Sequence, residues 1–317
     1  MDGPMGEDYL RTLFSEVSNW GRWGADDQLG TLNLIDTAAR LRGVASVRDG
    51  RTVSLSRPVT ALTPAEADAA ATEWGRPASL GLDNHGAGVP SEGFGVTSDS
   101  FAVSVHGATQ THLDALCHIF FDGRMYNGRP ASEVPASGST TNDISRIAGG
   151  VVTRGVLLDV PALRGGYVRA DEPVRLTELE EAERRTGVEI APGDALLIRL
   201  GRDLRWAAEG GQECEDATGE TRLQGMHPEV LGWLRERDVG ILVSDNGSDV
   251  TPPAYGFMLP IHIGTLVFLG CPLIDNADLE GLAAACAEVG RADFLFTVAP
   301  IPVPGATGSL VNPLAIV

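Results

Sequence analysis

The chain has 317 residues, with 24 basic and 43 acidic side chains and a formal net charge of −19 at pH 7. All 24 basic residues are arginine, so chemistry that needs a lysine amine, such as Schiff-base formation, is excluded. A chain this acidic repels a polyanion, so nucleic acid is not an expected partner.

Composition places the chain among folded, cytoplasmic proteins. Hydrophobic residues make up 43% of the sequence, which supplies a full core and excludes intrinsic disorder. The four cysteines show no CxxC pair, so neither a disulfide framework nor a thiolate zinc site is predicted. No signal-peptide pattern opens the chain, and no apolar run reaches the roughly 18 residues that cross a membrane. We therefore expect a cytoplasmic location and no membrane partner.

The first third of the chain contains an arm and a long irregular segment. We expect one domain over residues 1–317, in which residues 1–60 form an N-terminal arm and opening segment. Residues 74–98 are rich in Gly, Pro, Ser and Asn and show little periodicity, which predicts a long loop. Loops of this length in compact domains often cover a site, so we expect a lid here.

From residue 150 onward, apolar strand-like runs alternate with helical patterns. The predicted strands cover residues 150–160, 195–200, 239–244 and 292–298, and the predicted helices cover 177–186, 228–238 and 279–289. Thr177 and Glu180 are expected to form a capping box at the first helix, and Gly187 to end it. This alternation predicts an α/β fold around a central sheet. No GxGxxG follows a first strand, so no dinucleotide site is predicted.

Three of the six histidines lie close together in SVHGATQTHLDALCHIFF, residues 104–121. If residues 101–114 are extended, alternate side chains share one face, namely His106, Gln110, His112 and Asp114. Imidazole and carboxylate two residues apart can hold Zn²⁺, Mn²⁺ or Fe²⁺. His118 follows the strand and could act as a general acid or base. The same spacing also fits a polar strand edge whose histidines only form hydrogen bonds.

Several separate blocks carry a family resemblance. They are THLDALCH at 111–118, NWGRWGADDQLGTLNL at 19–34, FDGRMYNG at 121–128, SDNGSDVTP at 244–252, PIH at 260–262 and IDNADLEGLA at 274–283. In this order they resemble the longer bacterial members of the cyclase family of metal-dependent hydrolases, which includes kynurenine formamidase and isatin hydrolase. The resemblance implies a central mixed β-sheet with surrounding helices, in the swivelling β/α/β fold of that family.

The resemblance also implies roles for individual residues. His112, Asp114 and Asp275 match positions of metal ligands, and His118 with His262 matches a proton-transfer pair. A water on Zn²⁺ or Mn²⁺ would then attack an amide, formamide or lactone carbonyl of a small cyclic or aryl substrate. The expected assembly is a homodimer or homotetramer.

The chain departs from its relatives at the third histidine of the strand. Relatives carry a histidine four or two residues before the histidine of the THxD motif, where this chain has Ala108 or Gln110. Three outcomes are open. Gln110 or His106 completes a weaker site, the site takes a harder metal such as Mn²⁺, or the metal is lost. In the last case the scaffold would serve a biosynthetic cyclase, dehydratase or isomerase that uses His and Asp for acid–base chemistry.

Asp245 follows the predicted strand 239–244, at a strand end of the kind that hosts sites in α/β folds. We assign it a catalytic role, although turn formation explains an Asp in SDNGSDV equally well. A non-enzymatic binding protein on the same scaffold is a third reading of the whole chain.

Overall fold

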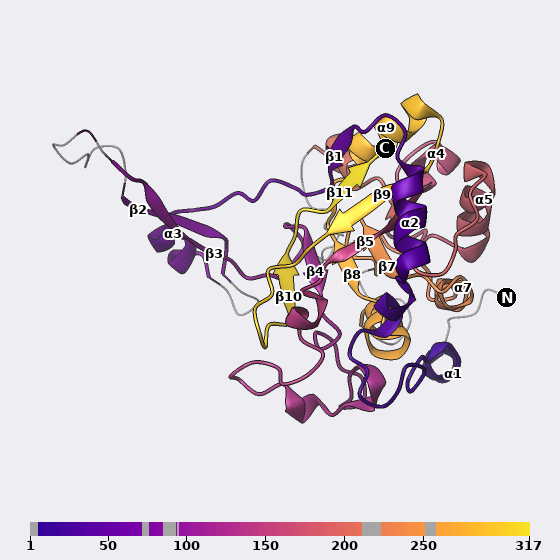
Figure 1. Cartoon of the computed structure of the whole chain (residues 1–317), viewed down its shortest axis with the longest axis horizontal. Helices are drawn as coiled ribbons and strands as arrows, with labels where there is room; N and C mark the ends of the chain where they lie inside the picture. The colour runs from indigo at the N-terminus through magenta and orange to yellow at the C-terminus, as the bar shows by residue number, and fades with distance from the viewer. Residues whose placement is uncertain (1–5, 72–75, 85–92, 94, 211–222, 251–257) are drawn as a thin grey trace.

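The computed structural model describes residues 6–71, 76–84, 93, 95–210, 223–250 and 258–317 (Figure 1). The strands of the main sheet are β1 (Thr52–Ser54), β4 (His112–Asp114), β5 (Val151–Asp159), β6 (Ala195–Arg199), β7 (Ile241–Ser244), β8 (Leu273–Asp275), β9 (Asp293–Val298), β10 (Gly308–Leu310) and β11 (Leu314–Ile316). The helices are α1 (Glu7–Val17), α2 (Thr37–Ser46), α3 (Pro64–Ala69), α4 (Val160–Arg164), α5 (Leu176–Thr186), α6 (Arg202–Ala208), α7 (Val230–Glu236), α8 (Pro260–His262) and α9 (Glu280–Val289). Short 3₁₀ turns lie at Gly30–Leu34, Tyr126–Gly128, Ala131–Glu133 and Ile144–Ile147, and the π-helix η6 spans Ile263–Leu269.

The main sheet is mixed, as predicted. Its order is β1-β11-β9-β5-β6-β7-β8-β4-β10. Strands β5 to β8 run parallel in its middle, whereas β9 pairs antiparallel on one side and β4 on the other. The parallel strands are joined by helical segments, which is the connection that parallel neighbours require.

The sheet is buried on both faces because its central strands carry apolar residues at successive positions. In β6, Leu196 and Ile198 pack toward α1, α5, α7 and η6, while Leu197 faces a second core that includes α9. Helix α2 packs on β5 and β9. It approaches closely at Gly43, where a Cβ would lie 2.5 Å from the backbone of Thr153.

Most predicted elements of the second half are present, and one cap was assigned to the wrong residues. Helix α5 begins at Leu176, and Glu178 accepts a hydrogen bond from the backbone N–H of Arg175 at 2.9 Å. The capping box predicted for Thr177 and Glu180 is therefore wrong, because the helix starts before Thr177. Gly187 ends the helix in the left-handed conformation, as predicted.

Residues 74–98 do not form one loop. Strand β2 (Ser79–Asn84) pairs antiparallel with β3 (Ser98–Ala102) in a separate two-stranded sheet, against which α3 packs. Figure 1 shows this unit of α3, β2 and β3 projecting from the body. It is called the arm below and is distinct from the N-terminal arm expected at residues 1–60. The prediction of a continuous loop is wrong at 79–84. Residues 74, 75, 85–92 and 94 of the predicted lid lie outside the described residues, so the lid role stays a prediction.

The predicted strand 101–114 is also interrupted. Only its two ends are strands, in β3 and β4, and residues 103–111 leave both sheets as a linker between the arm and the body. Side chains of the body, rather than a neighbouring strand, hold this linker, as described below.

Among the described residues, no helix combines the length and the apolar character that a membrane crossing needs.

Candidate metal centre

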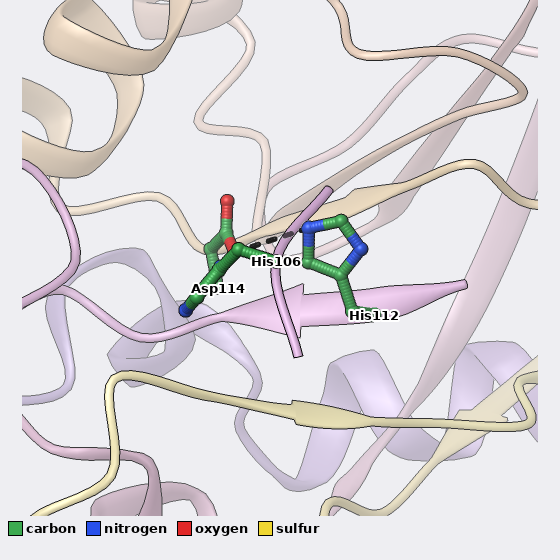
Figure 2. Close-up of side chains that lie close together, drawn as sticks. All are labelled: His106, His112 and Asp114. Carbon is green, nitrogen blue, oxygen red and sulfur yellow. Dashed lines mark ion pairs between the residues drawn. The ribbon is translucent and has the colours of Figure 1, made fainter. Parts of the chain in front are cut away.

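Strand β4 carries the centre of the candidate site. It lies between β8 and β10, and His112 pairs in register with Asp275 of β8. Directly opposed residues of an antiparallel pair point to the same face of a sheet, so these two side chains share a face with Asp114. Figure 2 shows His112 and Asp114 projecting from the β4 arrow.

His106 reaches this strand from the linker. Its Nδ1 atom lies 2.8 Å from Oδ1 of Asp114, and its Nε2 atom lies 2.9 Å from the hydroxyl of Thr307. Gly308 faces Asp114 across β10, and a Cβ there would lie 2.8 Å from Cε1 of His106. A glycine at position 308 therefore leaves the space that the imidazole occupies.

Two groups of metal-ligating atoms meet at one carboxylate. The first group is His106, His112 and Asp114, and the second group is Asp114, His262 and Asp275. Within each group the candidate ligand atoms lie within 4.8 Å of one another. Asp114 is common to both groups. The structure thus brings together five of the residues singled out from the sequence.

His262 is fixed in the second group by Asp249. The carboxylate of Asp249 accepts hydrogen bonds from the backbone N–H groups of Ile261 and His262, at 2.7 and 3.0 Å. Its Oδ2 atom also lies 2.6 Å from Nδ1 of His262. The other ring nitrogen, Nε2, then faces Asp275 Oδ2 at 3.0 Å. A carboxylate behind the ring is the usual means of orienting a histidine toward a metal.

The opening segment supports the helix behind His262. Trp20 donates its indole N–H to the carbonyl of Val267 at 2.6 Å, and Asn19 donates to Leu269 at 2.9 Å. Trp20 also stacks on Phe268, with ring centroids 5.5 Å apart. These contacts explain why the block at 19–34 accompanies the His/Asp motif in the sequence.

Burial and charge act against each other in the cluster. Burial raises the pKa of Asp114, but His118, His106 and His112 outweigh it and hold that pKa well below its usual range. Burial lowers the pKa of His262, but Asp275 and Asp249 outweigh it and raise that pKa well above the usual value. For His118, burial is the largest cause and lowers the pKa to about 4, so its ring is neutral at pH 7.

The donor set fits a divalent cation. Asp114 is 1% exposed, and neither of its carboxylate oxygens accepts a hydrogen bond of good geometry from a described residue. A buried carboxylate without hydrogen bonds is costly unless a positive charge compensates it. Imidazole with carboxylate is a suitable ligand set for Zn²⁺ or Mn²⁺.

Gln110 points its carboxamide elsewhere. Its Nε2 donates to the carbonyl of Ser104 at 2.5 Å, and its Oε1 accepts from the hydroxyl of Thr109. The ligand role predicted for Gln110 stays a prediction, and these hydrogen bonds do not favour it. His118 lies against the first group instead, because its ring stacks on that of His106 at 3.5 Å.

Asp245 lies outside both groups. Its carboxylate accepts backbone hydrogen bonds from Leu200, Gly201 and Arg202 at 2.7, 2.8 and 3.1 Å. These bonds secure the start of α6. The catalytic role predicted for Asp245 remains untested, and its full set of backbone donors favours a role in holding the chain.

A cavity of about 650 Å³ opens beside His106. Its wall includes Arg57 before α3, Arg76 between α3 and β2, and Ser104 and Gln110 of the linker. The cavity is large enough for a small cyclic molecule, since ligand pockets run from about 300 to 1,000 Å³. Of the residues in the two groups, His106 is the one that lines the cavity.

Sequence reasoning did not assign Asp249, Thr307, Arg202 or Asn276 to the site. Like Asp245, Asp249 could be a strand-end site residue or a turn residue, and nothing in SDNGSDV reveals that its carboxylate lies behind His262. Thr307 lies 201 positions beyond His106, and the β4–β10 pairing brings it there. Asn276 stands beside a predicted ligand in the IDN block, which is the one available signal.

An α/β fold that gathers three imidazoles and two carboxylates beside one short strand is an architecture typical of metal-dependent enzymes. A family model described as "Putative cyclase" matches residues 53–248, more than half of the chain. The chain belongs to the cyclase family. A comparison with curated proteins gives no match.

Solved structures share the fold. A structure described as a novel cyclase is 26% identical, covers 95% of this chain and 100% of its own, and superposes with a TM-score of 0.82. Isatin hydrolase A from Ralstonia solanacearum is 20% identical, with coverages of 84% and 91% and a TM-score of 0.56. Isatin hydrolase A from Labrenzia aggregata, bound to benzyl benzoate, is 19% identical, with coverages of 84% and 93% and a TM-score of 0.56.

Proposed function

We propose that the chain is a hydrolase that uses a divalent cation to open an amide, formamide or lactone bond in a small cyclic or aryl molecule. The observation that carries this proposal is the buried Asp114 carboxylate, which is shared by two groups of ligand atoms and has no hydrogen-bond donor of good geometry in the part of the chain that the structure describes. The fold shared with isatin hydrolases supports a cyclic substrate. The cavity beside His106 has room for one.

The first group, His106, His112 and Asp114, is the proposed cation site, with Zn²⁺ or Mn²⁺ as the expected ion. When bound, such a cation supplies Lewis acidity and lowers the pKa of a water ligand. Asp275 and His262 offer a second set of ligand atoms around the same Asp114. In this proposal His106 supplies the imidazole that the relatives carry in the strand and that is missing at Ala108 and Gln110.

His118 is the proposed proton-transfer residue. Its ring is neutral at pH 7 and lies against His106 at the edge of the first group, so it can accept a proton there. His262 was assigned to the same task from the sequence. Its hydrogen bond from Nδ1 to Asp249 leaves Nε2 for Asp275 or a cation, which favours a ligand or a charged partner over a proton shuttle.

The alternative is a cyclase, dehydratase or isomerase that works without a cation. The second group favours it, because His262, with a raised pKa, lies 3.0 Å from Asp275 and 3.7 Å from Asp114, so a protonated ring places one positive charge beside both carboxylates. Such a cluster would serve as an internal acid–base system.

Metal content and chelator sensitivity distinguish these two functions. We expect the untagged protein to purify with Zn²⁺ or Mn²⁺ and to hydrolyse a member of a panel of lactams, N-formyl arylamines and lactones. A strong chelator should abolish turnover, and the removed ion should restore it. Elemental analysis that finds no transition metal, together with chelator-insensitive turnover, would refute the hydrolase and support the alternative.

We also propose that the protein self-associates through the arm. Leu80, Leu82 and Phe101 are 42%, 58% and 50% exposed, and Leu80 pairs with Phe101 in register. Because alternate residues share a face, all three lie on one face of the arm, opposite the contact between Gly81 and Pro64 of α3. A two-stranded sheet is marginally stable unless its apolar face is covered.

Replacing Leu82 and Phe101 with serine should reduce the assembly to a monomer, because it removes most of this apolar face. Light scattering coupled to size-exclusion chromatography measures the mass. Leu41→Ser with Val44→Ser is the matched control, since these α2 residues are 63% and 54% exposed but lie outside the arm. An unchanged mass in the arm variant, or a monomeric wild type, would rule out the arm interface.

We place the protein in the cytoplasm, which suits the free buried cysteines Cys117, Cys271 and Cys286.

A further inference from the structure

We infer that Arg202 and Asn276 form a latch that positions His106 in the first group, and that Asp245 acts through this latch. The inference rests on the proposed cation site. The three residues are positioning residues, because none of them belongs to either His/Asp group.

Arg202 and Asn276 together hold the linker that carries His106. The guanidinium of Arg202 donates to Oδ1 of Asn276 and to the carbonyl of Ala108, each at 2.6 Å. The carboxamide of Asn276 donates to the carbonyl of Gly107 at 2.7 Å. Two consecutive carbonyls directly after His106 are thus fixed by two buried side chains.

The other end of the linker is bound to the same asparagine. The hydroxyl of Thr111 donates to the backbone carbonyl of Asn276 at 2.7 Å. Asn276 itself follows Asp275 at the end of β8 and has a φ of 56°, a conformation that asparagine adopts more readily than most residues. The linker is therefore bonded at both ends to the residue that follows Asp275, a ligand of the second group.

Asp245 fixes the direction from which Arg202 enters. Its carboxylate binds the backbone N–H groups of three consecutive residues, Leu200 to Arg202, at the start of α6. Residues 200–202 follow the end of β6 and have no strand pairing of their own. Without the bonds to Asp245, Arg202 would not be directed toward Asn276. Asp245, expected from the sequence to be catalytic, thereby gains a role two contacts away from the cluster.

A latch is needed because His106 is not on a strand. The strand pairing of β4 orients His112 and Asp114, whereas residues 103–111 lie outside both sheets. Besides Asp114 and the edge of the His112 ring, the side chain of His106 contacts the Thr307 hydroxyl and the His118 ring. Loss of such outer hydrogen bonds around a metal ligand lowers affinity about 10- to 100-fold in metalloenzymes.

For two variants, the latch and a simple change of charge predict opposite changes in cation affinity. Asn276→Asp keeps an acceptor for Arg202 but removes the donor to Gly107, and Arg202→Met removes both donors. Each change makes the surroundings of the site more negative, so charge alone predicts tighter cation binding. The latch predicts weaker binding of Zn²⁺ and Mn²⁺, on the order of 10-fold or more, measured by competition with a chromophoric chelator.

A double-mutant cycle with His106→Ala shows whether the effect passes through His106. The latch predicts that Asn276→Asp and Arg202→Met weaken binding in the wild type but change nothing further in His106→Ala. Arg164→Met is the matched control, because Arg164 binds Glu178 and the carbonyl of Glu172 between α4 and α5. Circular dichroism and thermal unfolding confirm that each variant folds, and Asn276→Asp, which is isosteric, carries the test should Arg202→Met unfold.

The outcomes separate the latch from the proposed function. Suppose that His106→Ala itself binds the cation poorly. Then unchanged or tighter binding in Asn276→Asp overturns the latch alone. So does a loss of affinity from Asn276→Asp that is equally large in the His106→Ala background. Wild-type affinity in His106→Ala overturns both the latch and the proposed first group. Weaker binding that disappears in the double variants supports both.

Discussion

Asp114→Asn should produce a folded protein that binds neither Zn²⁺ nor Mn²⁺. Asp114 is the only residue common to the two groups of described His and Asp ligands, so no complete group survives its loss. The amide keeps the shape of the side chain but removes the negative charge that compensates a cation. Turnover should fall by on the order of 1,000-fold or more, since the cation supplies several kcal/mol of transition-state stabilisation.

Asp143→Asn provides the control for Asp114→Asn. Asp143 is also a buried aspartate, but its carboxylate binds Gly305 N–H and the Ser145 hydroxyl outside both groups. Elemental analysis and chelator competition should show wild-type binding in this control. Stoichiometric metal in Asp114→Asn, with turnover retained, would contradict the cation site and leave the acid–base alternative.

The alternating half of the chain was predictable because its signals are local. Val151–Asp159, Ala195–Arg199 and Ile241–Ser244 are apolar at successive positions, and a strand covered on both faces requires that pattern. Glycine in the left-handed conformation marks the ends of α5 and α9 at Gly187 and Gly290. Strand order, by contrast, depends on pairings between distant segments, and the sequence predicted none; the family resemblance implied only a mixed central sheet.

The strand residues of the site were predictable for the same local reason. His112 and Asp114 share a face because side chains alternate along any strand. His106 was grouped with them by the same argument, but the argument was wrong, because residues 103–111 are not a strand. Arg202 and Asn276 position His106 through hydrogen bonds to the linker. Parity placed Gln110 with the ligands as well, although its carboxamide turns back to Ser104.

Contacts across long separations were beyond any sequence pattern. Asp249 binds His262 thirteen residues away, and Arg202 binds Asn276 seventy-four residues away. An aspartate in a turn looks the same whether it caps a backbone segment, as Asp245 does, or orients a histidine, as Asp249 does. Only the fold distinguishes them, because the direction of each carboxylate is set by the strands and helices around it.

His118→Ala should keep the cation and lose rate. The ring of His118 carries no ligand atom in either group, so affinity for Zn²⁺ or Mn²⁺ should stay within a few-fold of wild type. Its neutral imidazole is the proposed proton acceptor, and removing a general acid or base typically costs about 100-fold or more in kcat. We therefore expect a fall in kcat of that size with little change in KM.

Three measurements distinguish proton transfer by His118 from packing against His106. Added imidazole should restore part of the rate of His118→Ala, because a small base can enter the space left by the side chain. His227→Ala is the control, since His227 is a buried histidine beside Glu229 at the start of α7 and should retain its rate. A large loss of cation affinity in His118→Ala, without rescue by imidazole, would show that the 3.5 Å stack on His106 is the main role of His118.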